Sequence, residues 1–130
     1  MSMDIKARNS FDCGVSLLNS KQYYDQSVHC FYFSIIQLMK YKLANLKNNA
    51  VDYADQDNRS TGGSSHDWLM TQMFYSFSNR KDGNHFQDVF LQMKRLRKLA
   101  DYGCEHISLD QCLDCRELRE KAENYLRAVH

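Results

Sequence analysis

The sequence predicts an all-α fold, an antiparallel bundle of four to five helices, and three observations support that prediction. The 130 residues include no proline and only 5 glycines, so few positions interrupt a helix. Apolar side chains recur three and four residues apart over most of the chain, which is the period of an amphipathic helix. No segment alternates apolar and polar residues over the length of a β-strand.

The first half of the chain predicts two helices and a loop. The first helix is expected over residues 4–19 and ends in a polar turn. The second carries the widest apolar stripe, from Tyr24 to Leu46, and is therefore expected to be the central helix. Residues 47–65 are rich in Asn, Asp, Gln, Ser and Gly and predict a flexible loop, with an extension of the second helix over 49–55 left open.

The second half predicts three more helices. Ser65 is expected to cap the third helix. A turn over 79–84 is expected to precede the fourth helix, which spans residues 85–102. Ser108 and Gln111, three residues apart, match a capping box and predict the start of the fifth helix. Helices that each have one apolar face bury those faces against one another, which makes a bundle the expected architecture.

Length and charge limit the functions that this chain can have. Residues 1–130 suffice for a single domain with one core. The formal net charge is +1, so any binding to nucleic acid must depend on a local group of cations. No stretch reaches the roughly 18 apolar residues of a membrane span, and the first residues lack the apolar segment of a signal peptide. We therefore expect a cytoplasmic protein that does not contact a membrane.

The five cysteines, an odd number without a secretion signal, predict reduced thiols. Cys13 and Cys30 lie in amphipathic stretches and are expected to be small core residues. The residue types of a zinc site occur in the last quarter of the chain, at Cys104, His106, Cys112 and Cys115. Two interpretations stay open there: a zinc site or, because Cys112 falls on the buried stripe of a helix, two core residues and two loop residues. No cofactor is otherwise expected.

The last turns of the fourth helix hold the most informative polar cluster. Arg97 and Asp101 are four residues apart and share one helix face, and Tyr102 follows immediately. Lys98 is one of four cations within residues 94–98. Arginine binds phosphate through a rigid fork of donors. Two interpretations stay open: a site for a phosphate or nucleotide, or a structural helix end whose ion pair contributes roughly 0.2–0.5 kcal/mol.

The histidines differ in their expected roles. His29 falls within the central helix and is expected to be buried. His66 starts the third helix beside the predicted loop and is the stronger candidate for a site. Arg80 and His85 have the spacing of a cation and a base, but they fall in a turn and at a helix start, where a chance spacing is the simpler interpretation.

Several segments match the pattern of one known family. Tyr24-Asp25 follows the first helix, Tyr32 lies in the central helix, and Ser65-His66 enters the third. Residues 96–102 have the sequence Leu-Arg-Lys-Leu-Ala-Asp-Tyr, which is the most specific match. On these residues nearly the whole chain resembles a HEPN domain. It is most similar to the bacterial subgroup that has an Arg-x-x-Ala-Asp-Tyr motif and is often paired with minimal nucleotidyltransferases.

The resemblance implies a helical bundle, frequently a symmetric dimer, that acts in nucleotide or RNA transactions. Many HEPN domains are metal-independent ribonucleases with an Arg-x4–6-His motif, but here Tyr102 occupies the histidine position. A phenol with a pKa of about 10 is a poor general base near neutral pH. The resemblance thus implies a non-catalytic module of a toxin–antitoxin-type system that binds a nucleotide or RNA phosphate, a nucleotidyltransferase partner, or both. The residues expected to bind are Arg97, Asp101, Tyr102, His66 and Lys98.

Two alternatives accompany this expectation. A divergent ribonuclease toxin would use Arg97 to stabilise the phosphate, with His66 or His106 as the base. A structural, all-helical interaction protein would use the polar cluster only to end a helix. A homodimer is expected from the resemblance. The central helix and residues 74–77 also carry more aromatic surface than one inward-facing stripe needs, so the excess fits an interface.

Overall fold

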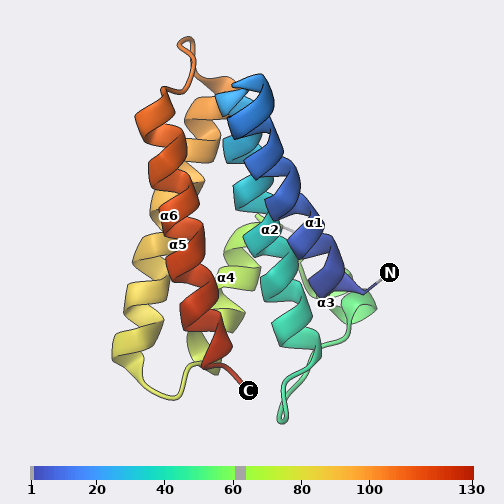
Figure 1. The fold of residues 1–130 in the computed structure, drawn as a ribbon. Helices are drawn as coiled ribbons and strands as arrows, with labels where there is room; N and C mark the ends of the chain where they lie inside the picture. Colours follow the sequence, from blue (N-terminus) through green and yellow to red (C-terminus); the bar gives the residue numbers. More distant parts are fainter. Residues whose placement is uncertain (1, 61–63) are drawn as a thin grey trace.

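The computed structural model of the chain describes residues 2–60 and 64–130, and within these ranges it contains helices and no β-strand (Figure 1). The elements in chain order are α1 (Met3–Ser16), the π-helical turn η1 (Leu17–Lys21), α2 (Tyr24–Ala44), α3 (Tyr53–Arg59), α4 (Ser65–Ser76), α5 (Arg80–Tyr102) and α6 (Leu109–Arg127). The predicted all-α class and the helical bundle are confirmed. No helix in the described ranges combines the length and the apolar character needed to cross a membrane.

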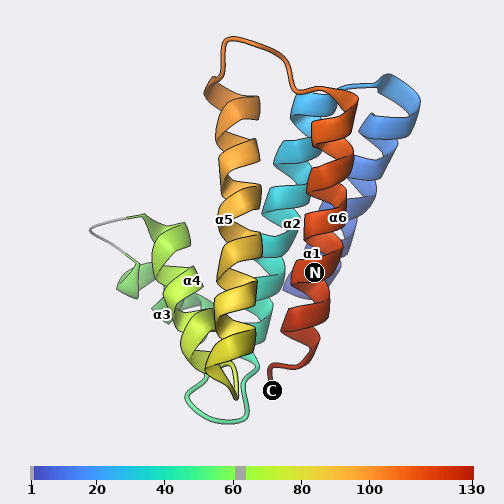
Figure 2. The same cartoon turned by 90° about the vertical axis from the view of Figure 1, so that its left-hand side faces the viewer.

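The four long helices α1, α2, α5 and α6 lie side by side, and each runs opposite to the one before it (Figure 1). α2 contacts all five other α-helices, as its wide apolar stripe predicts. Phe31, Tyr32, Ile35 and Met39 of α2 are fully buried. The short helices α3 and α4 lie beside α2 and α5 at one end of the bundle (Figure 2). The central position of α2 is what brings its side chains to the candidate site.

The first helix ends differently from the prediction. The α-helix stops at Ser16, and residues 17–21 continue as a π-helical turn in place of α-helix up to residue 19. The chain then turns at Gln22, whose φ of 54° is in the left-handed region. The Tyr23 N–H donates to the Leu17 carbonyl at 3.1 Å, which closes the turn and directs the chain into α2.

The predicted loop over residues 47–65 is partly wrong, because it contains α3, and α2 is not extended over 49–55. Asp52 caps α3 by accepting a hydrogen bond from the Asp55 N–H at 2.8 Å. The Gln56 side chain is buried and donates to the backbone carbonyls of Lys40 at 3.0 Å and Val51 at 2.8 Å. These bonds fix the polar segment against α2. The flexibility expected at residues 61–63 lies outside the described residues.

The start of the fourth predicted helix is also corrected. α5 begins at Arg80, five residues earlier than predicted, because Asn79 caps it by accepting from the Asp82 N–H at 2.8 Å. Gly83 lies inside this helix, where a Cβ would come within 3.2 Å of Phe74. The cap of α4 is Ser64 and not Ser65, whereas the capping box predicted at the start of α6 is confirmed.

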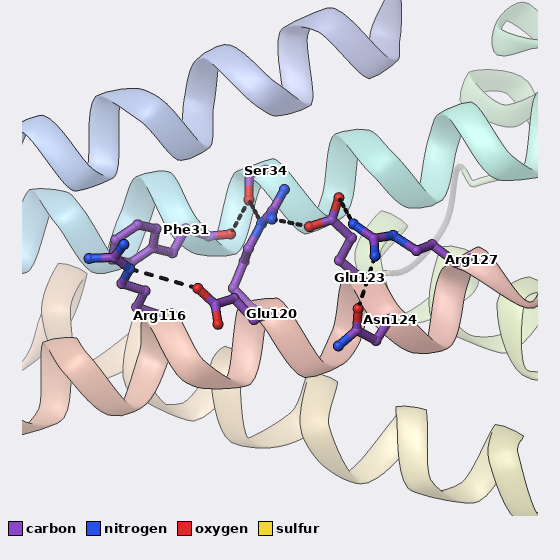
Figure 3. A network of polar contacts seen from close by, with 8 residues as sticks. Phe31, Ser34, Arg116, Glu120, Glu123, Asn124 and Arg127 are labelled. Carbon is purple, nitrogen blue, oxygen red and sulfur yellow. Dashed lines mark hydrogen bonds and ion pairs between the residues drawn. The ribbon is translucent and has the colours of Figure 1, made fainter.

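A buried cation joins α6 to α2 and α1. The Arg119 side chain is only 6% exposed, and its Nε donates to the Ser34 Oγ at 3.1 Å. Ser34 in turn donates to the Phe31 carbonyl at 2.7 Å, and Glu123 on α6 pairs with Arg119 (Figure 3). The guanidinium carbon lies 4.3 Å from the centroid of the Phe11 ring. Polar groups of α6 and α2 in this seam therefore satisfy one another's hydrogen-bonding capacity.

Candidate functional site

The polar cluster predicted at the end of α5 is formed. The Arg97 Nε lies 2.9 Å from the Asp101 Oδ2, and both side chains are largely buried. The buried Nε–H nevertheless has no hydrogen-bond partner among the described residues, so these two groups interact as an ion pair and not as an aligned hydrogen bond. Gly103 ends the helix, and its N–H donates to the Leu99 carbonyl at 2.9 Å.

Aromatic rings from two helices surround the Arg97 guanidinium. Its carbon lies 5.5 Å from the Tyr32 ring centroid and 5.6 Å from that of Phe33, both on α2. The Tyr102 ring on α5 itself lies at 5.9 Å. Cations within about 6 Å of a ring face are attracted to it. The rings therefore hold the cation in place, while the Tyr102 side chain remains 75% exposed.

His29 belongs to this cluster, and the prediction that it is buried is wrong. Its side chain is 46% exposed, and its Nδ1 lies 3.3 Å from the Asp101 Oδ1. The His29 ring also packs on Phe33, four residues later on the same helix face, with 4.6 Å between centroids. The helical period alone places His29 and Phe33 on one face of α2. It does not show that this face meets the end of α5.

His66 is brought to the same place from α4. Its Nδ1 lies 2.8 Å from the Tyr32 hydroxyl, and its ring centroid is 5.5 Å from the Phe33 centroid. Burial lowers the pKa of His66, as do the positive charges of Arg97, Lys40 and Lys94, whereas Asp67 opposes them. Burial raises the pKa of Tyr32, so its hydroxyl stays protonated and available to His66.

Lysines add positive charge on the α4 side of the cluster. Lys94 of α5 forms an ion pair with Asp67, and the pKa of Asp67 is lowered mainly by this contact. Lys98 is exposed on α5 and acts on Asp67 through its charge. Four cations, from Arg97, Lys40, Lys94 and Lys98, thus face two carboxylates, which leaves a local excess of positive charge.

A cavity of about 630 Å³ adjoins the other side of the cluster. Its wall is formed by η1, the first turns of α2 and the end of α5, through Leu17, Asp25, Gln26, His29, Cys30, Ala100, Asp101 and Tyr102. Next to it, Asp25 accepts from the Ile107 N–H at 2.7 Å and lies 2.8 Å from the His106 Nδ1. His106 therefore anchors the connection between α5 and α6 and does not join the Arg97 side chain.

The cysteines and histidine considered for zinc are not assembled into a site. Cys112 and Cys115 are buried in α6, and burial raises the pKa of both thiols, that of Cys115 to about 12. Cys104 and His106 are exposed in the connection before α6. Across the two described ranges, no three His, Cys, Asp or Glu side chains are grouped so that they could hold a metal ion. This placement agrees with the interpretation as core and loop residues.

The lowered pKa of His66 yields a direct prediction. An NMR titration of the imidazole resonances should show His66 losing its proton below the ordinary pKa of 6.5. The unfolded chain takes up that proton first as the pH falls, so folding stability should decrease below about pH 6.5. An Arg97→Gln variant should raise the pKa of His66 toward its ordinary value. Titration of wild-type His66 at or above that value would contradict the geometry of this cluster.

We call the candidate site the Arg97 cluster. It comprises seven side chains from α2, α4 and α5: His29, Tyr32, Phe33, His66, Arg97, Asp101 and Tyr102. Four of the five residues predicted to bind lie in it, and Lys98 lies on its rim. No family model, curated protein or solved structure matches the chain.

Proposed function

We propose that this chain is a HEPN-like helical module that binds a phosphate group of a nucleotide or RNA at the Arg97 cluster. The observation that carries the proposal is the convergence of Arg97 and His66 on the Phe33 ring, at 5.6 Å and 5.5 Å from its centroid. Burial lowers the pKa of His66, and the positive charges of Arg97, Lys40 and Lys94 lower it further. The chain as a whole has a net charge of only +1, so this positive potential is local. His66 lies in the first turn of α4, where the positive end of the helix dipole also favours an anion.

Two features favour binding over a purely structural role. The Tyr102 ring is 75% exposed beside Arg97, and a cavity of about 630 Å³ adjoins Asp101 and Tyr102. A helix end that served only packing would have buried these groups.

The wider proposal follows the resemblance: a cytoplasmic homodimer in a toxin–antitoxin-type system, with a nucleotidyltransferase as its partner. The homodimer is supported by Tyr75 of α4, an aromatic side chain that is 76% exposed. A monomer in light scattering at micromolar concentration would contradict the dimer.

Substituting Arg97 tests the phosphate site. Arg97→Ala should weaken binding of a 5′-phosphorylated RNA oligonucleotide and of ATP by about tenfold or more, because a charge-assisted hydrogen bond contributes about 1.5–3 kcal/mol. Fluorescence anisotropy with labelled forms measures both affinities. Arg95→Ala is the matched control, since Arg95 is exposed on the same helix but lines the groove toward Asp114 and Glu117 of α6. Equal affinities for the two variants and the wild type would overturn the proposal.

A second candidate, a metal-independent ribonuclease, is favoured by one observation. The structure brings His66, held neutral near pH 7 by its lowered pKa, into the same cluster as Arg97. In such a ribonuclease the neutral imidazole of His66 would act as the general base, and the guanidinium of Arg97 would stabilise the charge on the phosphate. Incubating the same RNA with the protein in EDTA decides between the two. Cleavage that is lost in both Arg97→Ala and His66→Ala would support the ribonuclease, and intact RNA would support binding alone.

A further inference from the structure

Helices α1 and α2 are in close contact at Gly14 and Phe31. A Cβ placed on Gly14 would lie 2.7 Å from the Phe31 Cε1, so only glycine fits there without a shift. The Phe11 and Phe31 ring centroids are 5.7 Å apart in the same seam. The two helices run in opposite directions (Figure 1).

This seam places two cysteines side by side. Cys13 precedes Gly14, and Cys30 precedes Phe31. In an antiparallel helix pair, the residues before two facing positions lie on the same edge of the interface, because each is rotated by about 100° toward that edge. Leu17, one turn after Cys13, lines the same cavity as Cys30, which places both cysteines on the cavity side.

The environments of the two thiols differ. Cys13 is exposed, contrary to the expectation of a core residue, whereas Cys30 is half-buried. The pKa of Cys30 is raised to about 11, first by burial and then by the charge and hydrogen bond of the neighbouring Cys13 thiol. Cys13 is therefore the accessible thiol, and Cys30 stays protonated next to it near neutral pH. The remaining buried cysteines, Cys112 and Cys115, are shielded from solutes within α6.

We propose that Cys13 and Cys30 form a hydroperoxide-sensitive dithiol that closes to a disulfide between α1 and α2. The Cys13 thiolate attacks a peroxide oxygen, the O–O bond breaks, and a sulfenic acid and hydroxide form. The Cys30 sulfur then attacks the Cys13 sulfur, the S–O bond breaks, and water leaves with the Cys30 proton. In sum, two thiols and one hydrogen peroxide give one disulfide and two waters. Cys30 follows His29 in the cavity wall, so the bridge forms beside the Arg97 cluster. The proposed dithiol does not depend on whether that cluster binds phosphate.

The experiment is oxidation of the folded protein with hydrogen peroxide, followed by alkylation and intact mass measurement. The expected result is loss of two alkylation sites together and a tryptic peptide pair that links Cys13 to Cys30. Dithiothreitol should restore both thiols. Cys13→Ser and Cys30→Ser should each abolish the bridge, while Cys104→Ser, which removes the exposed thiol before α6, should leave it unchanged.

Three results would overturn the proposal. A bridge that contains Cys104, oxidation of Cys13 only to sulfinic or sulfonic acid, or equal alkylation before and after peroxide would each show that the two thiols do not meet. Circular dichroism of each variant verifies that the helices are retained, which is expected because Cys13 is exposed and serine is close to cysteine in size.

Discussion

Replacing Phe31 with alanine is expected to lower the free energy of unfolding by about 3–5 kcal/mol, the cost of removing a buried phenylalanine ring from a core. Phe31 is fully buried in α2, and its ring occupies the space that Gly14 leaves open in α1. The substitution also removes the ring contact with Phe11, whose centroid lies 5.7 Å from that of Phe31. Urea denaturation monitored by circular dichroism measures this change. If the dependence of the free energy of unfolding on urea concentration is unchanged, the shift of the transition midpoint gives the loss of stability.

Tyr75→Ala is the matched control for Phe31→Ala. Tyr75 is also an aromatic residue on a helix, but its side chain is 76% exposed, and its ring contacts Phe74 at 5.4 Å between centroids. In the monomer, its loss should cost within about 0.5 kcal/mol, as for most surface substitutions, so both variants are compared at a protein concentration where light scattering shows monomers. Similar losses for the two variants would mean that α1 and α2 do not meet at Phe31. A light-scattering measurement of each variant separates a loss of stability from a change of oligomeric state.

The helices with strong apolar faces could be predicted from the sequence because burial of those faces decides their packing. The wide stripe of α2 correctly indicated its central position, and the spacing of Arg97 and Asp101 correctly indicated their pairing at 2.9 Å. The cap at Ser108 was identifiable because both of its partners lie within three residues. These features depend on neighbours in the chain, which a periodic pattern shows directly.

The features that could not be predicted depend on partners distant in the chain. α3 has a polar composition, and its buried anchor is Gln56, which donates to the Lys40 carbonyl sixteen residues away. The start of α5 could not be predicted because Asn79 and Gly83 are typical turn residues. In the structure, Asn79 caps the helix, and Gly83 lies inside it in close contact with Phe74. Local propensity favoured a turn, and packing against α4 favoured a helix.

The same distinction applies to the Arg97 cluster. Arg97, Asp101 and Tyr102 are sequence neighbours and could be grouped by spacing, and His66 was proposed from the resemblance. Phe33 and His29 were not expected, since they reach the site only because α2 crosses the end of α5. A histidine within an apolar helix is usually buried, but the position of His29 on the α5 side of α2 leaves it exposed and paired with a carboxylate.

Arg119→Ala is expected to cost roughly 3 kcal/mol, the lower end of the range for breaking a buried ion pair by removing one partner. The substitution leaves the Ser34 hydroxyl without its donor at 3.1 Å, and it leaves Glu123 without its buried cation. It also removes the guanidinium from the Phe11 ring. The loss stays near the lower end because Arg127 lies 3.6 Å from Glu123 and remains as a second cation (Figure 3).

Arg116→Ala separates this buried pairing from ordinary surface charge. Arg116 lies one turn earlier on α6, is 36% exposed, and its Nε is 3.9 Å from the Glu120 Oε1, so its loss should cost less than about 1 kcal/mol. A double-mutant cycle of Arg119→Ala with Ser34→Ala should show a coupling of at least about 0.5 kcal/mol, because the two side chains share one hydrogen bond. Additive losses in that cycle would show that the hydrogen bond between Arg119 and Ser34 does not hold α6 to α2, and that Arg119 stabilises the fold through Glu123 and Phe11.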